Sequence, residues 1–456
     1  MENNKKSKFS RVLQTKDVLV LAFGAMIGWG WVVQAGDWIL GAGTIGAALA
    51  FVMGGLMIYF VGLTYAELTS AMPKCGGEHV FSQRALGKTV SFICTWSLIL
   101  SYISVVLFEV ISLPTVLEYI FPGLAQVHLY TIAGYDVKLT MVLVGVVGAI
   151  IITLINYFGV KMAAVVQTVL VCLMAAIGIA LMSGSLVSGN IGNIQPLFSD
   201  GLGGVLKVLV LTPFFYMGFD VIPQAAEEIN IPFKKIGKIM LLSIILAVVW
   251  HLIIIISVSF VMSEGQMALS NLVTAEAMKL AFGNKQIFAT ILILGGLSGI
   301  ITSWNAFFVG GSRAIYAMAE SEMLPSFFAK LSKHKTPTIA IIFIGIVSCI
   351  APFFGRKALL WVSNAGGFSV VVAYFIVSIS FLVLRFKEPN MERPYKVKCG
   401  ILVGVLAVIM SGFVLSLYLI PGLPSCLTLP EWIIVGVWLL IGLIMFILYR
   451  IKKTKI

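Results

Sequence analysis

The chain has 456 residues, of which 60% are hydrophobic and only 11% are charged. A soluble protein of this size cannot bury so much apolar surface, so the composition excludes a soluble globular fold and indicates an integral membrane protein. The formal net charge of +12 does not indicate nucleic-acid binding, because the basic residues fall in the predicted loops of one side. The first apolar run is too long for the core of a cleavable signal peptide, and we expect none.

Apolar runs long enough to span a bilayer recur along the chain, and each helical span needs about 20 residues. Twelve such runs occur, at approximately 17–42, 45–71, 90–119, 139–158, 162–184, 204–228, 238–263, 286–318, 337–354, 358–384, 400–420 and 431–450. The loops between them are short. The pattern predicts an all-α integral membrane protein with 12 transmembrane helices.

The distribution of Lys and Arg predicts the orientation, because cytoplasmic loops carry an excess of both. With the N-terminus in the cytoplasm, internal segments hold 25 of the 31 basic residues and external segments hold six. The external residues are Lys138, Lys207, Lys279, Lys285, Arg356 and Lys357. We therefore expect a multi-pass protein of the cytoplasmic membrane with both termini inside the cell.

Two predicted spans are interrupted near the middle of the membrane. The first contains Gly28 and Gly30, and the sixth contains Gly218, Asp220 and Pro223. Non-helical backbone at membrane depth is viable only where protein buries it or a wet cavity adjoins it. Gly28 and Gly218 are 190 residues and five spans apart, and interrupted helices at corresponding positions of two halves indicate a transporter site. The alternative for the glycines of the first span is a packing notch between helices.

Five short motifs, in order along the chain, resemble the amino acid–polyamine–organocation transporter family. They are Gly28-Trp29-Gly30; Pro73 to Glu78 with Phe81 and Ala85-Leu86-Gly87; Gly218-Phe219-Asp220 with Glu227-Glu228 and Pro232; Ser312-Arg313 to Leu324-Pro325; and Arg393-Pro394-Tyr395. The resemblance implies a leucine-transporter-like fold. Its transport core, 17–384, would hold a 5+5 inverted repeat with helices 1 and 6 broken. Residues 1–16 would form a cytoplasmic segment, and 385–456 would add helices 11 and 12.

The resemblance also implies amino acids or related amines as substrates, moved by alternating access. Free amides at the first break would hold a substrate carboxylate, and free carbonyls at the second would hold its ammonium group. The predicted substrate-binding residues are Ile27, Gly28, Trp29, Gly30, Phe215, Met217, Gly218, Phe219, Ser101, Trp304 and Phe307. Trp29 departs from the small residue that the family commonly has there. Either it points away from the site, or the site has a different shape.

Asp220 and Glu109 are the predicted coupling residues, because an acid inside a span is costly and indicates function. Family members that exchange arginine for agmatine carry an acid at the place that matches Asp220, where it is implicated in pH sensing. Asp220 can take up a proton or bind an amine. At 1.5 Å of rise per residue, Glu109 should lie about 12 Å from Asp220 along the membrane normal, so a shared proton is not expected. For both acids a hydrogen-bonded structural carboxyl is the alternative.

We predict a secondary active transporter for amino acids or related amines, working by proton-coupled symport or by substrate exchange. A sensor without transport activity and a polyamine or amine exchanger are the alternatives. No Ser/His/Asp grouping, metal-ligand spacing or phosphate-binding loop occurs, so we expect no enzyme activity, cofactor or metal site. The expected partners are the small-molecule substrate, H⁺ and the lipid bilayer, without nucleic acid, for a monomer or homodimer.

Overall fold

The computed structural model describes residues 9–132, 134–270, 272–355, 358–423 and 425–454. The first eight helices are α1 Thr15–Met26, α2 Gly30–Val33, α3 Ala35–Ala42, α4 Thr44–Ala71, α5 Glu78–Leu86, α6 Lys88–Ile120, α7 Leu139–Phe158 and α8 Val160–Ser188. The strands β1 His128–Ile132 and β2 Tyr135–Lys138 form an antiparallel hairpin between α6 and α7.

The remaining α-helices are α9 Gly201–Leu209, α10 Thr212–Tyr216, α11 Val221–Gln224, α12 Phe233–Val261, α13 Glu264–Ala268, α14 Val273–Ala281, α15 Gln286–Glu320, α16 Thr338–Ile350, α17 Ala358–Lys387, α18 Gly400–Leu419 and α19 Leu429–Thr454. Four short 3₁₀ helices are η1 Ile191–Ile194, η2 Ala226–Glu228, η3 Ser326–Ala329 and η4 Ala351–Phe354.

Within the described residues, eleven helical stretches are long and apolar enough to cross a membrane. The ninth predicted span coincides with α16 and η4, Thr338–Phe354, which form a shorter apolar helix. Its α-helical part ends at Ile350, and Pro352 lies in the 3₁₀ turn that follows. The chain is therefore an all-helical, multi-span membrane protein, as its composition predicted.

Both predicted interruptions are present. The first span is helical to Met26, irregular over 27–29 and helical again from Gly30. The sixth is helical to Tyr216, irregular over 217–220 and resumes as the short α11. We call these segments, 27–29 and 217–220, the first break and the second break.

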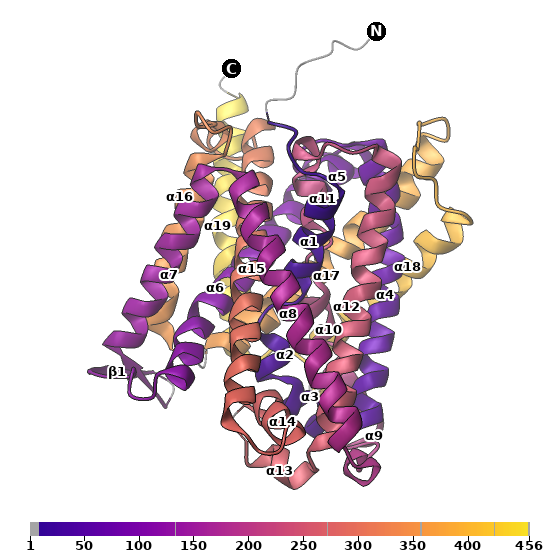
Figure 1. Ribbon diagram of the computed structural model, residues 1–456. Helices are drawn as coiled ribbons and strands as arrows, with labels where there is room; N and C mark the ends of the chain where they lie inside the picture. Colours follow the sequence, from indigo (N-terminus) through magenta and orange to yellow (C-terminus); the bar gives the residue numbers. More distant parts are fainter. Residues whose placement is uncertain (1–8, 133, 271, 356–357, 424, 455–456) are drawn as a thin grey trace.

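The two breaks lie near the centre of a bundle of long helices (Figure 1). The helix α1 packs against α8, α12 and α15, while α6 packs against both α15 and α17. In Figure 1, α1 begins and α19 ends at one end of the bundle, where α5 also lies, and the β1–β2 hairpin lies at the other. We name these the terminal end and the hairpin end.

A short strap precedes α1 at the terminal end. The backbone amides of Val12 and Leu13 donate to the carbonyl of Glu228, at 2.9 and 3.0 Å, and Asn230 N–H donates back to Leu13. The Phe9 ring packs edge-on against Tyr316 of α15, with 5.2 Å between the ring centroids. The strap thus ties the start of the first span to the segment that follows the second break.

Candidate functional site

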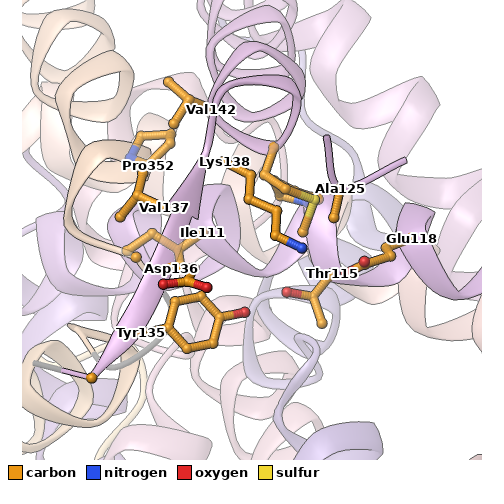
Figure 2. Close-up of a pocket in the computed structure, with 14 residues that line it drawn as sticks. Ile111, Thr115, Glu118, Ala125, Tyr135, Asp136, Val137, Lys138, Val142 and Pro352 are labelled. Carbon is orange, nitrogen blue, oxygen red and sulfur yellow. The ribbon is translucent and has the colours of Figure 1, made fainter. Parts of the chain in front are cut away.

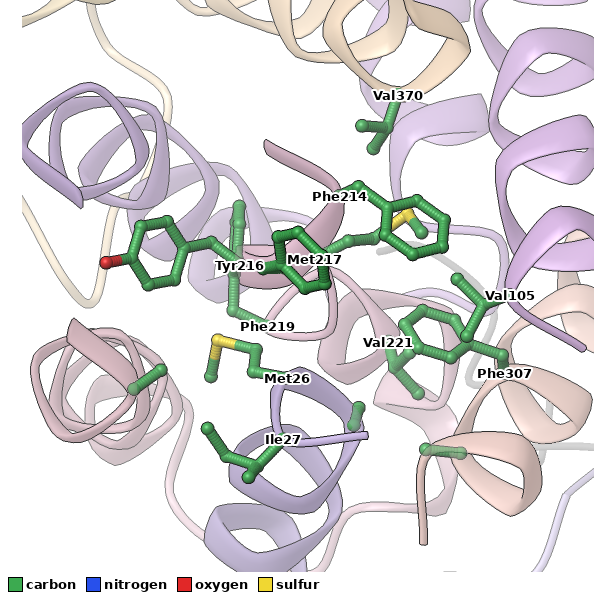
Figure 3. Packing of buried hydrophobic residues seen from close by; sticks show 14 of the residues in the cluster. Met26, Ile27, Val105, Phe214, Tyr216, Met217, Phe219, Val221, Phe307 and Val370 are labelled. Atoms are coloured by element: carbon green, nitrogen blue, oxygen red, sulfur yellow. The ribbon is translucent and has the colours of Figure 1, made fainter. Parts of the chain in front are cut away.

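The second break presses against the last turn of α1. Gly218 has a φ of +144°, a backbone conformation that residues with a side chain rarely adopt. A Cβ built there would lie 2.7 Å from the Cβ of Ala25 and 2.8 Å from the amide nitrogen of Met26. Figure 3 shows Met26 and Ile27 beside Met217 and Phe219, all of them buried. The two interruptions are therefore in contact with each other, and the region around them is the candidate central site.

The first break is in contact with α6 and α15. A Cβ on Gly28 would lie 2.2 Å from Oε1 of Glu109 and 3.1 Å from the Ser303 hydroxyl. On the facing helix, a Cβ at Gly299 would lie 2.6 Å from the carbonyl oxygen of Gly28. The absence of a Cβ at Gly28 and Gly299 permits this approach. Gly28 therefore allows the first break to pack closely against α15, in addition to interrupting the helix.

The Glu109 carboxylate occupies the first break. It lies beside the backbone N–H of Trp29 and the Ser303 hydroxyl. The side chain is 1% exposed, and its Oε2 has no hydrogen-bond partner among the described residues. A free amide at this break was predicted to hold the substrate carboxylate, whereas a carboxyl group of the protein itself already lies beside the Trp29 amide.

The large tryptophans of the first break turn toward neighbouring helices. A Cβ on Gly296 of α15 would lie 2.1 Å from the Trp29 ring. The Trp31 ring packs edge-on against Trp250 of α12, with 5.3 Å between centroids. Both rings are 1% exposed. They act as packing groups against α15 and α12, which explains how a tryptophan fits between Gly28 and Gly30.

Phe215 connects the two breaks. A Cβ on Gly30 would lie 2.2 Å from Cε1 of the Phe215 ring, so the ring fills the space that this glycine leaves. The same ring is 4.8 Å from Trp38 and 6.2 Å from His251, measured between centroids. These aromatic groups close the hairpin-end side of the central site.

The remaining predicted residues differ in where they lie. Phe307 of α15 packs against Tyr102 of α6 at 5.3 Å, and Figure 3 shows it beside Val105 and Val221 near the second break. The Ser101 hydroxyl donates to the Ser97 carbonyl within α6, at 3.1 Å. The Trp304 ring faces α7, where a Cβ on Gly148 would lie 3.3 Å from it.

Asp220 is fully buried at the end of the second break. Its Oδ1 accepts a hydrogen bond of 2.7 Å from the backbone N–H of Gly218, while its Oδ2 has no such partner among the described residues. The hydroxyls of Tyr102 and Tyr374 lie beside this carboxylate, and neither reaches hydrogen-bond geometry with any described group. The sequence singled out Asp220, but not Tyr374 of α17, which lies beside it.

Two other buried acids have arginine partners. Glu228 binds Arg313 of α15, with Nε to Oε1 at 2.8 Å, and both side chains are almost completely buried. Glu67 of α4 binds Arg385 and also Arg393, the latter at 2.9 Å. All three arginines lie near the terminal end, where they tie α4 and the segment after the second break to other helices.

A separate pocket lies at the hairpin end, between α6, the hairpin and the start of α7 (Figure 2). Its volume is about 400 Å³. In Figure 2 the Lys138 ammonium group points toward Thr115 of α6, and the Asp136 carboxylate lies beside the Tyr135 ring. Hydrogen bonding from Thr131 and the charge of His128 hold the pKa of Asp136 below its ordinary value. The pocket is not formed by either break.

Comparison with known proteins supports one family. A family model described as "Amino acid permease" matches residues 13–446. The branched-chain amino acid permease BcaP of Bacillus subtilis (strain 168) is 29% identical over 98% of this chain and 94% of its own length. The methylthioribose transporter of the same organism is 28% identical, over 99% and 96%. The histidine permease HisP of Lactococcus lactis is 24% identical, over 90% and 88%. These relatives are transporters, not enzymes.

Proposed function

We propose that this protein is a secondary transporter that moves amino acids or related amines across the cytoplasmic membrane by alternating access. The chain belongs to the amino acid permease family, and the proposal starts from that membership. The observation that carries this proposal is the contact between the two breaks, with Gly218 against Ala25 and Met26 in the middle of the bundle. Broken helices that meet at mid-membrane supply backbone groups for a polar substrate. An inverted repeat of 5+5 helices would allow the site to open to either side in turn.

The walls of the site favour a substrate with an apolar part. Met26, Ile27, Phe215 and Phe307 are all at most 7% exposed and carry no polar side-chain group other than the Met thioether. Arg313, Arg385 and Arg393 do not contribute to this wall, because they bind Glu228 and Glu67 near the terminal end. We therefore propose a neutral amino acid with an apolar side chain as the substrate, which agrees with the branched-chain amino acids for which the relative BcaP is named.

One observation favours a second candidate, a related amine without a carboxylate. The Glu109 carboxyl group already lies beside the Trp29 amide, and a substrate carboxylate at that amide would meet a like charge unless Glu109 were protonated. A cationic amine would instead be attracted to Glu109 and to Asp220. The two candidates thus differ in whether the substrate needs its own carboxylate.

Uptake into proteoliposomes tests the function and separates the candidates. We expect radiolabelled isoleucine or leucine to accumulate, and the decarboxylated amine of the same side chain to compete weakly. Stronger competition by the amine would favour the second candidate. Binding of these compounds, detected as a raised unfolding temperature, without any uptake would identify a sensor and contradict the transport proposal.

A matched pair of variants tests the proposed site. Phe307→Ala removes a ring from the site wall, and we expect at least a tenfold rise in the substrate concentration for half-maximal uptake. Phe353 lies in η4 and is 42% exposed, so Phe353→Ala should leave uptake unchanged. Equal effects of the two substitutions would show that Phe307 does not line the substrate path.

A further inference from the structure

Six buried polar atoms that reach hydrogen-bond geometry with no group among the described residues gather on the terminal-end side of the second break. They are Oδ2 of Asp220, Oε1 of Glu78, Oε1 of Gln224 and the hydroxyls of Tyr65, Tyr102 and Tyr374. All six side chains are 0% exposed. An unpaired buried polar atom costs about 1–3 kcal/mol and is rare in native proteins. Six of them on five helices and the second break therefore indicate a chamber whose missing partners are water or protons.

The six groups form one connected network. Gln224 Nε2 donates a hydrogen bond to Oε2 of Glu78, and the Tyr65 hydroxyl lies beside the same carboxylate. The rings of Tyr65 and Tyr374 are 5.8 Å apart, measured between centroids. Tyr374 in turn lies beside Asp220. The two carboxyl groups are thus joined through phenol and amide groups that can bind water.

Glu78 reaches this chamber because α5 begins against α11. Gly77 precedes the helix with a φ of +35°, and a Cβ there would lie 2.6 Å from the Cβ of Pro223. This contact brings the first residue of α5 next to the segment after the second break. Figure 1 shows α5 beside α11 at the terminal end, so the network leads from the central site toward that end.

The basic groups near α5 are already bound elsewhere. Arg84 binds Glu388, Arg313 binds Glu228, and Lys387 donates to the Ala85 carbonyl at the far end of the helix. His79 is neutral at physiological pH, because burial lowers its pKa to about 4. The remaining titratable groups near Glu78 on the packed elements carry no positive charge; they are Tyr65 of α4, Cys94 and Tyr102 of α6, Tyr374 of α17 and Asp220.

Two carboxylates in one buried chamber cannot both stay ionised without a cation. Burial, and then the charge of Asp220, raise the pKa of Glu78 well above its ordinary value. A single proton held by the pair leaves one negative charge, which the surrounding hydroxyls and water can hydrogen-bond.

We propose that Glu78 and Asp220 form a carboxyl pair that holds one shared proton, and that Glu78 releases this proton toward the cytoplasm during transport. In the transfer step the O–H bond on Asp220 breaks and an O–H bond forms on Glu78, through water and the tyrosine hydroxyls. The pair keeps its charge of −1 during this transfer. It keeps the same charge through the release if a proton from the other side of the membrane binds Asp220 as Glu78 gives its proton to water. This inference rests on the proposed transport function for its role, but the shared proton itself does not depend on it.

Infrared difference spectroscopy of the purified full-length protein tests the shared proton without any transport. We expect a protonated-carboxyl C=O band at neutral pH that changes in intensity and frequency in Glu78→Gln and also in Asp220→Asn, because each substitution removes the partner with which the proton is shared. Glu388 is an acid of the same end bound to Arg84, and Glu388→Gln should keep the band. A band that persists unchanged in either single variant would overturn the proposal.

Proteoliposomes test the release step. We expect Glu78→Gln to retain exchange of internal for external substrate but to lose at least tenfold of the accumulation driven by a proton gradient. Glu78→Asp, which keeps the carboxyl group, should restore most of it, and this rescue separates proton release from a folding defect. Unchanged gradient-driven accumulation in Glu78→Gln would overturn the release role. Absence of all uptake and exchange by the wild type would instead refute the proposed function. The infrared result would then still test whether Glu78 and Asp220 share a proton.

Discussion

Four buried acids of this protein form two groups that differ in their partners, not in their burial. Glu67 and Glu228 are 1% and 3% exposed and bind arginines near the terminal end. Glu109 and Asp220 are 1% and 0% exposed, adjoin the two breaks and have no basic partner among the described residues. An acid bound to arginine has its charge fixed, whereas an acid without a cation can gain or lose a proton. The paired group therefore suits a structural role, and the unpaired group suits a transport cycle.

The strongest test of this difference removes an arginine. Arg313→Met would leave Glu228 buried without its cation, and breaking a buried pair in this way costs about 3–5 kcal/mol of unfolding free energy. Thermal unfolding of the purified variant in detergent measures the loss. The double variant Arg313→Met, Glu228→Leu removes both charges and should recover most of the stability. Equal stability of the wild type and the single variant would show that the Glu228 pair is not structural.

Neutralising the unpaired acids should have a much smaller effect on stability. Asp220→Asn keeps the side-chain oxygen that accepts the Gly218 N–H, and Glu109→Gln keeps an oxygen for the Trp29 amide. Neither change leaves a buried opposite charge without its partner. We therefore expect the free energy of unfolding to change by no more than about 1 kcal/mol. The same thermal unfolding assay applies. A loss of stability as large as that of Arg313→Met would show that these acids are structural too, and that the two groups do not differ.

The smallest effect is expected at an exposed ion pair of the terminal end. Arg84 binds Glu388 through two nitrogens, at 2.9 and 2.6 Å, with about half and a third of the two side chains exposed. Such pairs contribute about 0.2–1 kcal/mol and weaken with salt. Arg84→Gln should therefore cost less than 1 kcal/mol at pH 7.

The pH dependence of that pair follows from its pKa shift. Hydrogen bonding from Arg84 lowers the pKa of Glu388 below its ordinary value. The stabilisation is therefore present above the ordinary glutamate pKa and is lost as the pH falls through the lowered one. Unfolding temperatures of the wild type and Arg84→Gln should differ at pH 7 and converge in acid; a difference that grows in acid would contradict this assignment.

The sequence predicted the features that depend on local chemistry. Apolar runs predicted the spans. Two glycines predicted the first break, and a glycine with an acid and a proline predicted the second. Gly218 has a positive φ, which a residue without a Cβ adopts most readily. The role of Asp220 in the site stays a prediction, based on the cost of burying its charge.

The partners of these residues could not be predicted, because they depend on how helices rotate against one another. The contact of Glu109 with Gly28 and Ser303 joins three spans that are distant in sequence. The direction of the Trp29 ring is set by the space over Gly296 of α15. Glu78 stood in a recognised motif of a polar loop, and its burial became evident only from the packing of α5 on α11. Tertiary packing, rather than composition, decides these positions.

The most direct test of the account compares proton-driven uptake by the wild type and Asp220→Asn in the same proteoliposomes. The wild type should accumulate substrate when the outside is acid, and Asp220→Asn should lose that response while unfolding at a nearly unchanged temperature. Loss of the pH response without loss of stability is the result that the division into paired and unpaired acids predicts. Uptake with the wild-type pH dependence in Asp220→Asn would contradict it.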